Sequence, residues 1–139
     1  MAAGTKAIVQ AAYAAWRSGD AAALDALCAD DFSMAINVPA TVHPLGGLTA
    51  GKKDSFDRLA VIAEQFEILS YEVRDLIAEG EHAAAQAHLR YVHRPTGERL
   101  ETTLGHFWTV RGGKIVELIE YHDLDRIKPF SDRIVERID

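Results

Sequence analysis

The stretch that decides the fold is GHFWTVRGGKIVELIEYHD, residues 105–123. Apolar residues alternate on both sides of RGGK, a pattern typical of two strands joined by a tight glycine turn. Three titratable residues, His106, Glu120 and His122, interrupt the apolar positions. The sequence therefore places ionisable groups in strands that otherwise have the pattern of a core.

The glycine turn predicts which residues of this hairpin face one another. With the turn centred on Gly112-Gly113, three cross-strand pairs follow: His106 with Glu120, Trp108 with Leu118, and Val110 with Val116. Because side chains alternate across a sheet, we expect one face to carry His106, Trp108, Leu118, Glu120 and His122. The other face carries Phe107, Thr109, Ile119 and Tyr121. A shift of one residue at the turn would change these partners.

The pair of His106 and Glu120 indicates proton-transfer chemistry. Residues directly opposed on neighbouring strands have Cβ atoms about 5 Å apart. In a low-dielectric cavity the pair holds the carboxylate ionised and raises the histidine pKa, or burial leaves Glu120 protonated. Either state suits general acid–base catalysis. The alternative is a polar pair that satisfies itself or faces solvent.

Two further segments alternate with period two. Residues 70–80, SYEVRDLIAEG, and residues 82–93, HAAAQAHLRYVH, read as strands separated by a turn at Gly80-Glu81. In the second strand one face carries Ala85, Ala87, Leu89 and Tyr91. RPTGE then has the composition of a hairpin loop. The last four strands are therefore predicted to form a meander.

The first half of the chain is mainly helical in pattern. Apolar residues recur at helical spacing over residues 5–18, 21–29 and 52–69, whereas residues 31–39 alternate as a strand and residues 40–51 read as a loop. A short helical tail broken by Pro129 closes the chain. This order predicts an α+β fold with three N-terminal helices packed on a strongly curved antiparallel sheet, enclosing a cone-shaped pocket.

Composition and net charge indicate which classes of binding partner are unsuited to this protein. A chain of 139 residues predicts one domain, residues 1–139. The net charge of −6 and the lack of a basic run argue against nucleic acid and anionic membranes. No signal-peptide pattern or membrane-length apolar run is present, so we expect a cytoplasmic protein. The single cysteine, Cys28, is expected to be a buried apolar residue, and no Cys/His spacing predicts a metal or cofactor.

Four motifs together carry a resemblance to a known family. They are AYAAWRSGDAAALDALCADDF, GGLTAGKKDSFDRL, IAEGEHAAAQAHLRYVHRPTGE and GKIVELIEYHD. In this order they resemble the nuclear transport factor 2-like superfamily, and within it the SnoaL-like polyketide cyclases. The resemblance implies a cone-shaped, cystatin-like roll and a homodimer formed through the open face of the sheet. It also implies acid–base roles for Glu120, where those cyclases carry an aspartate, and for His106, where they carry a histidine.

Two related enzyme types match less well. Ketosteroid isomerases share this fold, but their basic aspartate precedes a proline where this chain has Val38 before Pro39. Tyr13 lies one residue from the position of their tyrosine donor, a rotation of about 100° on a helix. Limonene epoxide hydrolases use an Asp-Arg-Asp set, and the nearest arginine, Arg90, is predicted on the other face from Leu89 and Tyr91.

The functional hypothesis is a small-molecule enzyme that performs cyclisation, isomerisation or hydration without a cofactor on an apolar carbonyl- or epoxide-type substrate. Glu120 and His106 are the predicted catalytic residues. The predicted substrate-binding residues are Tyr13, Trp16, Phe56, Trp108, Leu118 and His122. For the aromatic residues the alternative is core packing, and for His122 it is a place at the rim or in solvent. The alternative functions are a non-catalytic binding protein for an apolar ligand and a dimeric interaction module. His43 is a candidate lid residue, and His82, His88 and His93 are expected at the surface or at an interface.

Overall fold

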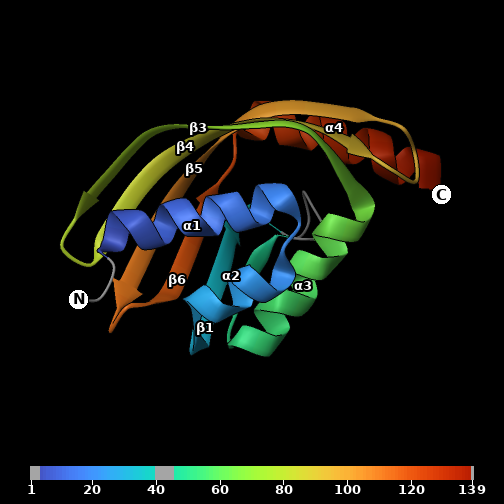
Figure 1. Cartoon of the computed structure of the whole chain (residues 1–139). Helices are drawn as coiled ribbons and strands as arrows, with labels where there is room; N and C mark the ends of the chain where they lie inside the picture. Colours follow the sequence, from blue (N-terminus) through green and yellow to red (C-terminus); the bar gives the residue numbers. More distant parts are fainter. Residues whose placement is uncertain (1–3, 40–45, 139) are drawn as a thin grey trace.

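The computed structural model describes residues 4–39 and 46–138, and His43 lies outside them. In chain order the elements are α1 (Thr5–Ser18), α2 (Ala21–Leu27), β1 (Cys28–Asn37), β2 (Gly47–Thr49), α3 (Lys52–Gln65), β3 (Phe66–Glu79), β4 (His82–His93), β5 (Arg99–Arg111), β6 (Lys114–Tyr121) and α4 (Leu124–Ile138). Figure 1 shows the long strands arching over α1, which lies in the hollow of the sheet.

One curved sheet organises the fold, with strand order β2-β1-β6-β5-β4-β3. The predicted α+β class and the meander from β3 to β6 are confirmed. The sheet is not purely antiparallel, because β1 pairs with β6 in parallel. The short strand β2 lies within the segment predicted as a loop and pairs with β1, Met34 facing Thr49. Three helices precede the meander as expected, and a fourth follows it.

The register of the β5–β6 hairpin is confirmed for the pairs that matter to the site. His106 lies opposite Glu120, and Trp108 opposite Leu118. The predicted pair of Val110 with Val116 is wrong, because Val110 faces Ile115. The two-residue turn closes on Arg111 and Lys114, with positive φ of 60° and 77° at Gly112 and Gly113. A two-residue turn fixes the pairing of the residues that flank it. The pairs nearest the turn are therefore shifted by one residue from the predicted register, and a β-bulge accommodates this shift.

Two helix ends were predicted too late. The second helix ends at Leu27, and Cys28 already begins β1. The third helix ends at Gln65, and residues 66–69 belong to β3. Phe66 pairs with His93 across the sheet, and its ring lies 5.8 Å from that of Tyr91. Tertiary pairing therefore decides a short apolar run for which helical and strand spacing are both possible.

The C-terminal tail is one helix that continues through Pro129, so the predicted break is wrong. Ile127, Phe130 and Ile134 are buried, which gives α4 an apolar stripe against the rest of the protein. The Phe130 ring lies 6.0 Å from Phe66. We infer that this burial offsets the backbone hydrogen bond lost at the proline.

The prediction that His93 lies at the surface or at an interface is wrong, because only 1% of its surface is exposed. It packs against Phe66 and Phe130 at ring distances of 5.2 and 6.3 Å. Its Nδ1 lies 2.8 Å from Oγ1 of Thr96 in the following turn. Burial lowers the pKa of His93. The predicted inner face of β4 was correct for its apolar residues, but the prediction did not extend this face to His93 at the end of the strand.

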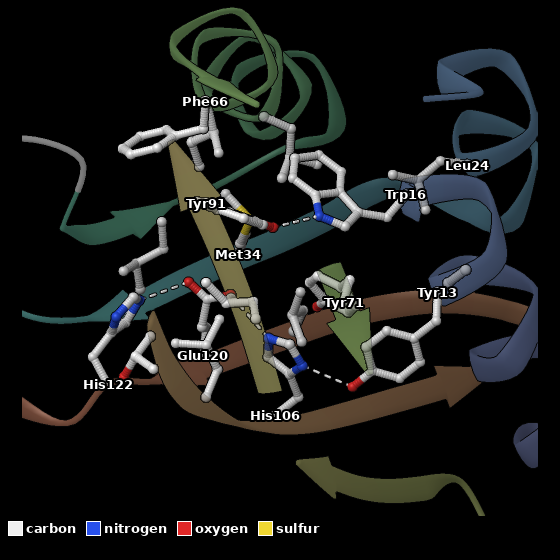
Figure 2. A pocket seen from close by; sticks show the side chains of 18 of the residues that line it. Tyr13, Trp16, Leu24, Met34, Phe66, Tyr71, Tyr91, His106, Glu120 and His122 are labelled. Atoms are coloured by element: carbon white, nitrogen blue, oxygen red, sulfur yellow. Dashed lines mark hydrogen bonds and ion pairs between the residues drawn. The ribbon is translucent and has the colours of Figure 1, made fainter. Parts of the chain in front are cut away.

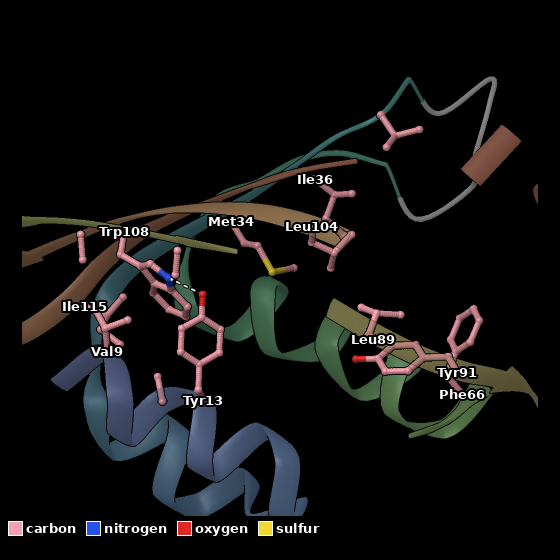
Figure 3. Close-up of a cluster of buried hydrophobic side chains, with 14 of the residues drawn as sticks. Val9, Tyr13, Met34, Ile36, Phe66, Leu89, Tyr91, Leu104, Trp108 and Ile115 are labelled. Atoms are coloured by element: carbon pink, nitrogen blue, oxygen red, sulfur yellow. Dashed lines mark hydrogen bonds between the residues drawn. The ribbon is translucent and has the colours of Figure 1, made fainter. Parts of the chain in front are cut away.

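The core lies on the concave side of the sheet. The alternation predicted for β1 is confirmed, because Phe32, Met34, Ile36 and Val38 are all buried. Figure 3 shows Val9 and Tyr13 of α1 facing Trp108 and Ile115 of the last hairpin. Cys28 is buried, as expected for a small apolar residue. The core therefore joins the first helix to the strands that carry the titratable residues.

Candidate functional site

A cavity of about 120 Å³ lies between α1 and the concave face of the sheet. Its lining is mainly apolar and aromatic, with contributions from Tyr13, Trp16, Met34, Tyr71, Leu89, Tyr91, Leu104, Trp108 and Leu118 among others. The polar side chains in the lining include Thr102, His106, Glu120 and His122. Ligand sites commonly combine an apolar wall with a few placed polar groups.

A chain of hydrogen bonds crosses this cavity (Figure 2). The Tyr13 hydroxyl accepts from Nε1 of Trp108 at 3.1 Å and lies 2.7 Å from Nδ1 of His106. Nε2 of His106 lies 2.9 Å from Oε1 of Glu120. The other carboxylate oxygen, Oε2, lies 2.8 Å from Nε2 of His122. We call these five residues the relay.

The relay assigns the tautomers of its two histidines. An ionised carboxylate only accepts hydrogen bonds, so Nε2 of both His106 and His122 carries the proton that is donated to Glu120. In neutral His106 the Nδ1 atom then accepts from the Tyr13 hydroxyl. Only 5% of His106 and 3% of Tyr13 is exposed, so water competes little for these bonds.

Glu120 is held ionised by its partners. Burial alone raises the pKa of its carboxyl group. The hydrogen bonds that His106 and His122 donate to the carboxylate oppose this effect and are the main reason that the pKa of Glu120 lies well below its usual range. Burial raises the pKa of Tyr13, although the hydrogen bond from Trp108 acts in the opposite direction. At neutral pH the site therefore combines a carboxylate with an un-ionised phenol.

A second aromatic group closes the other side of the cavity. Nε1 of Trp16 donates to the Tyr91 hydroxyl at 3.0 Å. Tyr71 stacks on Tyr91 with ring centres 6.4 Å apart, and it also lies 6.2 Å from Tyr13. Burial raises the pKa of both Tyr71 and Tyr91. These phenols are therefore neutral walls of the cavity.

The predicted residues mostly meet at this site. Glu120 and His106 are in direct contact, and the lining includes Tyr13, Trp16, Trp108, Leu118 and His122. Phe56 does not line this cavity. It packs edge-on against Phe32 at 6.2 Å and lines an outer hollow of about 360 Å³ between α1, α3 and β3. The two spaces share Trp16 and Tyr91 in their walls.

The structure also places Val38 and Arg90, the two residues compared with ketosteroid isomerases and limonene epoxide hydrolases. Val38 lines the cavity, so an apolar group takes the position of the isomerase base. Arg90 is exposed on the convex face and pairs there with Glu101 at 3.3 Å. His122 is more buried than a rim position implies, because only 11% of its side chain is exposed.

Sequence reasoning missed two polar lining residues, Tyr71 and Thr102. Tyr71 is on β3 opposite Leu89, and Thr102 is on β5 also opposite Leu89. Alternation along β5 from His106 back through Leu104 would have placed Thr102 on the inner face. For Tyr71 the irregular pairing of β3 around Asp75, where φ is 55°, weakens the same signal.

Two buried polar atoms in the lining have no hydrogen-bond partner in the described part of the chain. They are Oγ1 of Thr102 and Nδ1 of His122. Buried polar atoms are almost always paired, so each such atom is a candidate contact for a ligand or water. Within the described ranges, no group of three or more His, Cys, Asp or Glu side chains is arranged to hold a metal. None of the helices described has the length and hydropathy needed to cross a membrane.

A family model for the SnoaL-like domain matches residues 9–118, which is most of the chain. The protein belongs to the SnoaL-like family. In this SnoaL-like protein, Tyr13, His106 and Trp108 of the relay lie within the matched region, whereas Glu120 and His122 follow it. No curated protein matches the chain.

Solved structures share the fold of this SnoaL-like protein. A nuclear transport factor 2-like protein of Burkholderia xenovorans is 27% identical, with a TM-score of 0.77 over 89% of this chain and 92% of that one. A proposed polyketide cyclase of Xanthomonas campestris is 22% identical, with a TM-score of 0.74 over 91% and 96%. A proposed isomerase of Rhodopseudomonas palustris is 18% identical, with a TM-score of 0.78 over 90% and 93%.

Proposed function

We propose that this SnoaL-like protein is a cofactor-independent enzyme that moves protons on a small apolar molecule bearing a carbonyl or epoxide oxygen. The reaction is a cyclisation, an isomerisation or a hydration. The observation that carries this proposal is the ionised Glu120 carboxylate, held between His106 and His122 in an otherwise apolar cavity.

The energetic cost of the relay supports a functional role. Moving a carboxylate and imidazoles out of water costs free energy, and apolar residues of similar size are often as stable or more stable in such places. Titratable groups with strongly shifted pKa values inside a cleft are typical of catalytic sites. Glu120 meets both conditions, since it lines the cavity and its carboxyl pKa is lowered.

The lining limits the substrate class. Aromatic and aliphatic side chains dominate the wall, which favours an uncharged, flat or ring-containing molecule. The volume of about 120 Å³ is close to that of an engineered cavity of ~150 Å³ that takes up benzene. Larger substrates would extend past Trp16 and Tyr91 into the outer hollow. The names of the proposed cyclase and isomerase that share the fold agree with this reaction class.

A substrate screen with matched variants tests the proposal. Wild type, Glu120→Gln and Glu117→Gln are assayed for ring opening of small epoxides and for hydrogen–deuterium exchange next to the carbonyl of small ketones. Glu117 lies on the same strand but faces the other side of the sheet, opposite Thr109. We expect Glu120→Gln to lose about 10²–10⁴-fold of the activity, and Glu117→Gln to keep it. Equal activity of all three on every substrate would remove Glu120 from the mechanism.

The alternative is a binding protein that holds an apolar ligand without turnover. The bonds from Trp108 to Tyr13, His106 and Glu120 satisfy one another, as a structural network would. This alternative predicts saturable uptake of ligands with no reaction of any substrate. A pure interaction module is less well supported, because it predicts a filled interior and the structure has a cavity.

A further inference from the structure

One histidine nitrogen of the relay has no hydrogen-bond partner in the part of the chain described. Both ring nitrogens of His106 are occupied, by Tyr13 and by Glu120. Both oxygens of Glu120 are occupied by histidines. His122 differs, because its Nε2 meets Glu120 while its Nδ1 is buried without a partner. With the proton on Nε2, the Nδ1 atom of this lining residue carries a lone pair that has no partner within the described residues.

Thr102 provides a second, independent free group at the same end of the cavity. Its Oγ1 is buried without a partner, and only 4% of the residue is exposed. Gly105 pairs with Tyr121, so continuation of the register places Leu104 opposite His122. Thr102 is the next inward-facing residue of β5, which makes it a diagonal neighbour of His122. Side chains at such positions can reach one small group between them.

We propose that His122 is the proton-transferring residue of this cavity and that Thr102 holds the substrate oxygen beside it. This inference rests on the proposed function and assigns its chemistry to atoms. Glu120 then becomes a positioning residue, which orients His122 and offsets the positive charge that His122 gains. His106, Tyr13 and Trp108 hold Glu120 in place from the other side.

The proton balance of this assignment closes without a co-reactant. Nδ1 of His122 takes a proton from the carbon next to a carbonyl group, the electron pair of the broken C–H bond forms a C=C bond, and the carbonyl π pair moves to the oxygen. The Thr102 hydroxyl donates a hydrogen bond to the resulting enolate oxygen. In a β,γ-unsaturated carbonyl compound the enolate extends over the neighbouring double bond, so the imidazolium returns its proton at the γ carbon and the product is the conjugated isomer. The Glu120 carboxylate accepts from Nε2–H throughout.

The geometry favours His122 over Glu120 for this role. Each Glu120 oxygen already accepts a hydrogen bond from a histidine, which lowers its basicity, whereas Nδ1 of His122 has no partner within the described residues. The lowered carboxyl pKa also makes Glu120 a weak base near neutral pH. A carboxylate that orients an imidazole whose other nitrogen faces the substrate is the arrangement of the Ser-His-Asp triad, without its nucleophile.

A binding measurement tests the polar end of the cavity without requiring turnover. Phenol carries one hydroxyl on a ring that suits the cavity, and toluene is its size-matched apolar control. The phenol O–H would donate to Nδ1 of His122, and its oxygen would accept from Thr102. Affinities of both compounds are measured by calorimetry for wild type, Thr102→Val, His122→Gln and Thr103→Val. Thr103 is the matched control, because it is exposed on the same strand.

We expect wild type to prefer phenol over toluene by about tenfold, since a buried hydrogen-bonding group gains a partner. Thr102→Val and His122→Gln should each remove most of this preference, while Thr103→Val keeps it. The side-chain amide introduced by His122→Gln can still donate to Glu120, so the relay is disturbed little. Equal preference in wild type and both variants, or no preference in wild type, would overturn the subsite.

An exchange measurement tests the base. Hydrogen–deuterium exchange of cyclohexanone in D₂O is followed by proton NMR for wild type, His122→Gln and His122→Gly. We expect both variants to fall to the rate without protein, and added imidazole to restore exchange in His122→Gly. Full exchange activity in His122→Gln, with loss in Glu120→Gln, would overturn the assignment while the proposed function survives. If wild type accelerates the reaction of no substrate in the screen, the proposed function is wrong. The affinity for phenol relative to toluene would still test whether His122 and Thr102 form a binding subsite.

Discussion

The hydroxyl of Tyr13 lies 2.7 Å from Nδ1 of His106, and this contact joins the first helix to the middle of the sheet. The same hydroxyl accepts from Nε1 of Trp108. One phenol oxygen on α1 thus sets the orientation of two side chains on β5. The position of α1 and the protonation pattern of the relay are therefore coupled.

Tyr13→Phe tests this coupling. Removal of the hydroxyl leaves Nδ1 of His106 and Nε1 of Trp108 unpaired in the interior, so we expect the free energy of unfolding to fall by about 1–3 kcal/mol. The measurement is urea denaturation at neutral pH. Tyr71→Phe is the matched control, because no hydrogen bond of the Tyr71 hydroxyl is found within the described residues, and it should change stability by less than ~0.5 kcal/mol. Equal effects of the two substitutions would contradict the coupling.

The lowered pKa of Glu120 predicts how stability depends on pH. In the unfolded chain a glutamate titrates at about pH 4.3, whereas the folded carboxyl group titrates lower. The unfolded state therefore binds more protons between these two values, and stability falls as the pH falls through them. We measure the free energy of unfolding of wild type and Glu120→Gln over this pH range. The amount by which wild type is more stable should decrease as the pH is lowered. A difference that stays constant from neutral pH to below the unfolded pKa would contradict the prediction.

Cys28 should resist modification in the native protein. Burial is the main cause that raises the pKa of its thiol, to about 12, so very little thiolate exists near neutral pH. A charged, bulky disulfide reagent at about pH 8 should react only as fast as the protein unfolds. The same protein in concentrated denaturant should react at once, and this gives the reference rate. Rapid modification without denaturant would show that the thiol is accessible.

A row of apolar side chains on the convex face of the sheet indicates a dimer interface. Register places an apolar row across five strands: Ala35, Ile119, Phe107, Ala84 and Ile77. Phe107 is 38% exposed and Ile77 68% exposed. We propose that a second copy covers this row, as the family resemblance implies, since contiguous exposed apolar surface commonly marks an interface.

Phe107→Arg tests this interface by sedimentation equilibrium. A charge in the middle of the row should shift the protein from dimer to monomer, because an unpaired buried charge is costly. Val61→Arg is the control, since Val61 is also 38% exposed but lies on helix α3 and not on the sheet. A monomeric wild type, or an unchanged dimer in Phe107→Arg, would exclude this face.

The pairing of His106 with Glu120 could be predicted because a hairpin register depends on local information. The turn and the alternation around it lie within one short segment, so His106 and Glu120 could be paired without knowledge of the rest. The bulge beside Val116 was missed, because a single register was applied to the whole hairpin. The two-residue turn requires a pairing next to it that differs by one residue from the pairing further along the strands. The pairs of His106 with Glu120 and of Trp108 with Leu118 were unaffected by this error.

The features that were missed depend on contacts between distant segments. Phe66 extends β3 because its partner His93 lies across the sheet, and periodicity alone does not reveal such a partner. The burial of His93 depends on Phe130 of α4, from the far end of the chain. The hydrogen bond from His122 to Glu120 lies beyond the last regular strand pair, where alternation gives little guidance. Local rules therefore located the site and long-range packing completed it.

The parallel pairing of β1 with β6 has a consequence for the order of folding. Met34 pairs with Leu118, so this ladder closes a very long loop that contains the whole meander. Closing such a loop is entropically costly, and proteins rich in distant contacts fold slowly. During synthesis β1 must wait for β6 to leave the ribosome before its buried side chains have a partner. We expect refolding to show early protection of amide hydrogens in β3–β5 and late protection in β1, which pulsed hydrogen exchange would reveal.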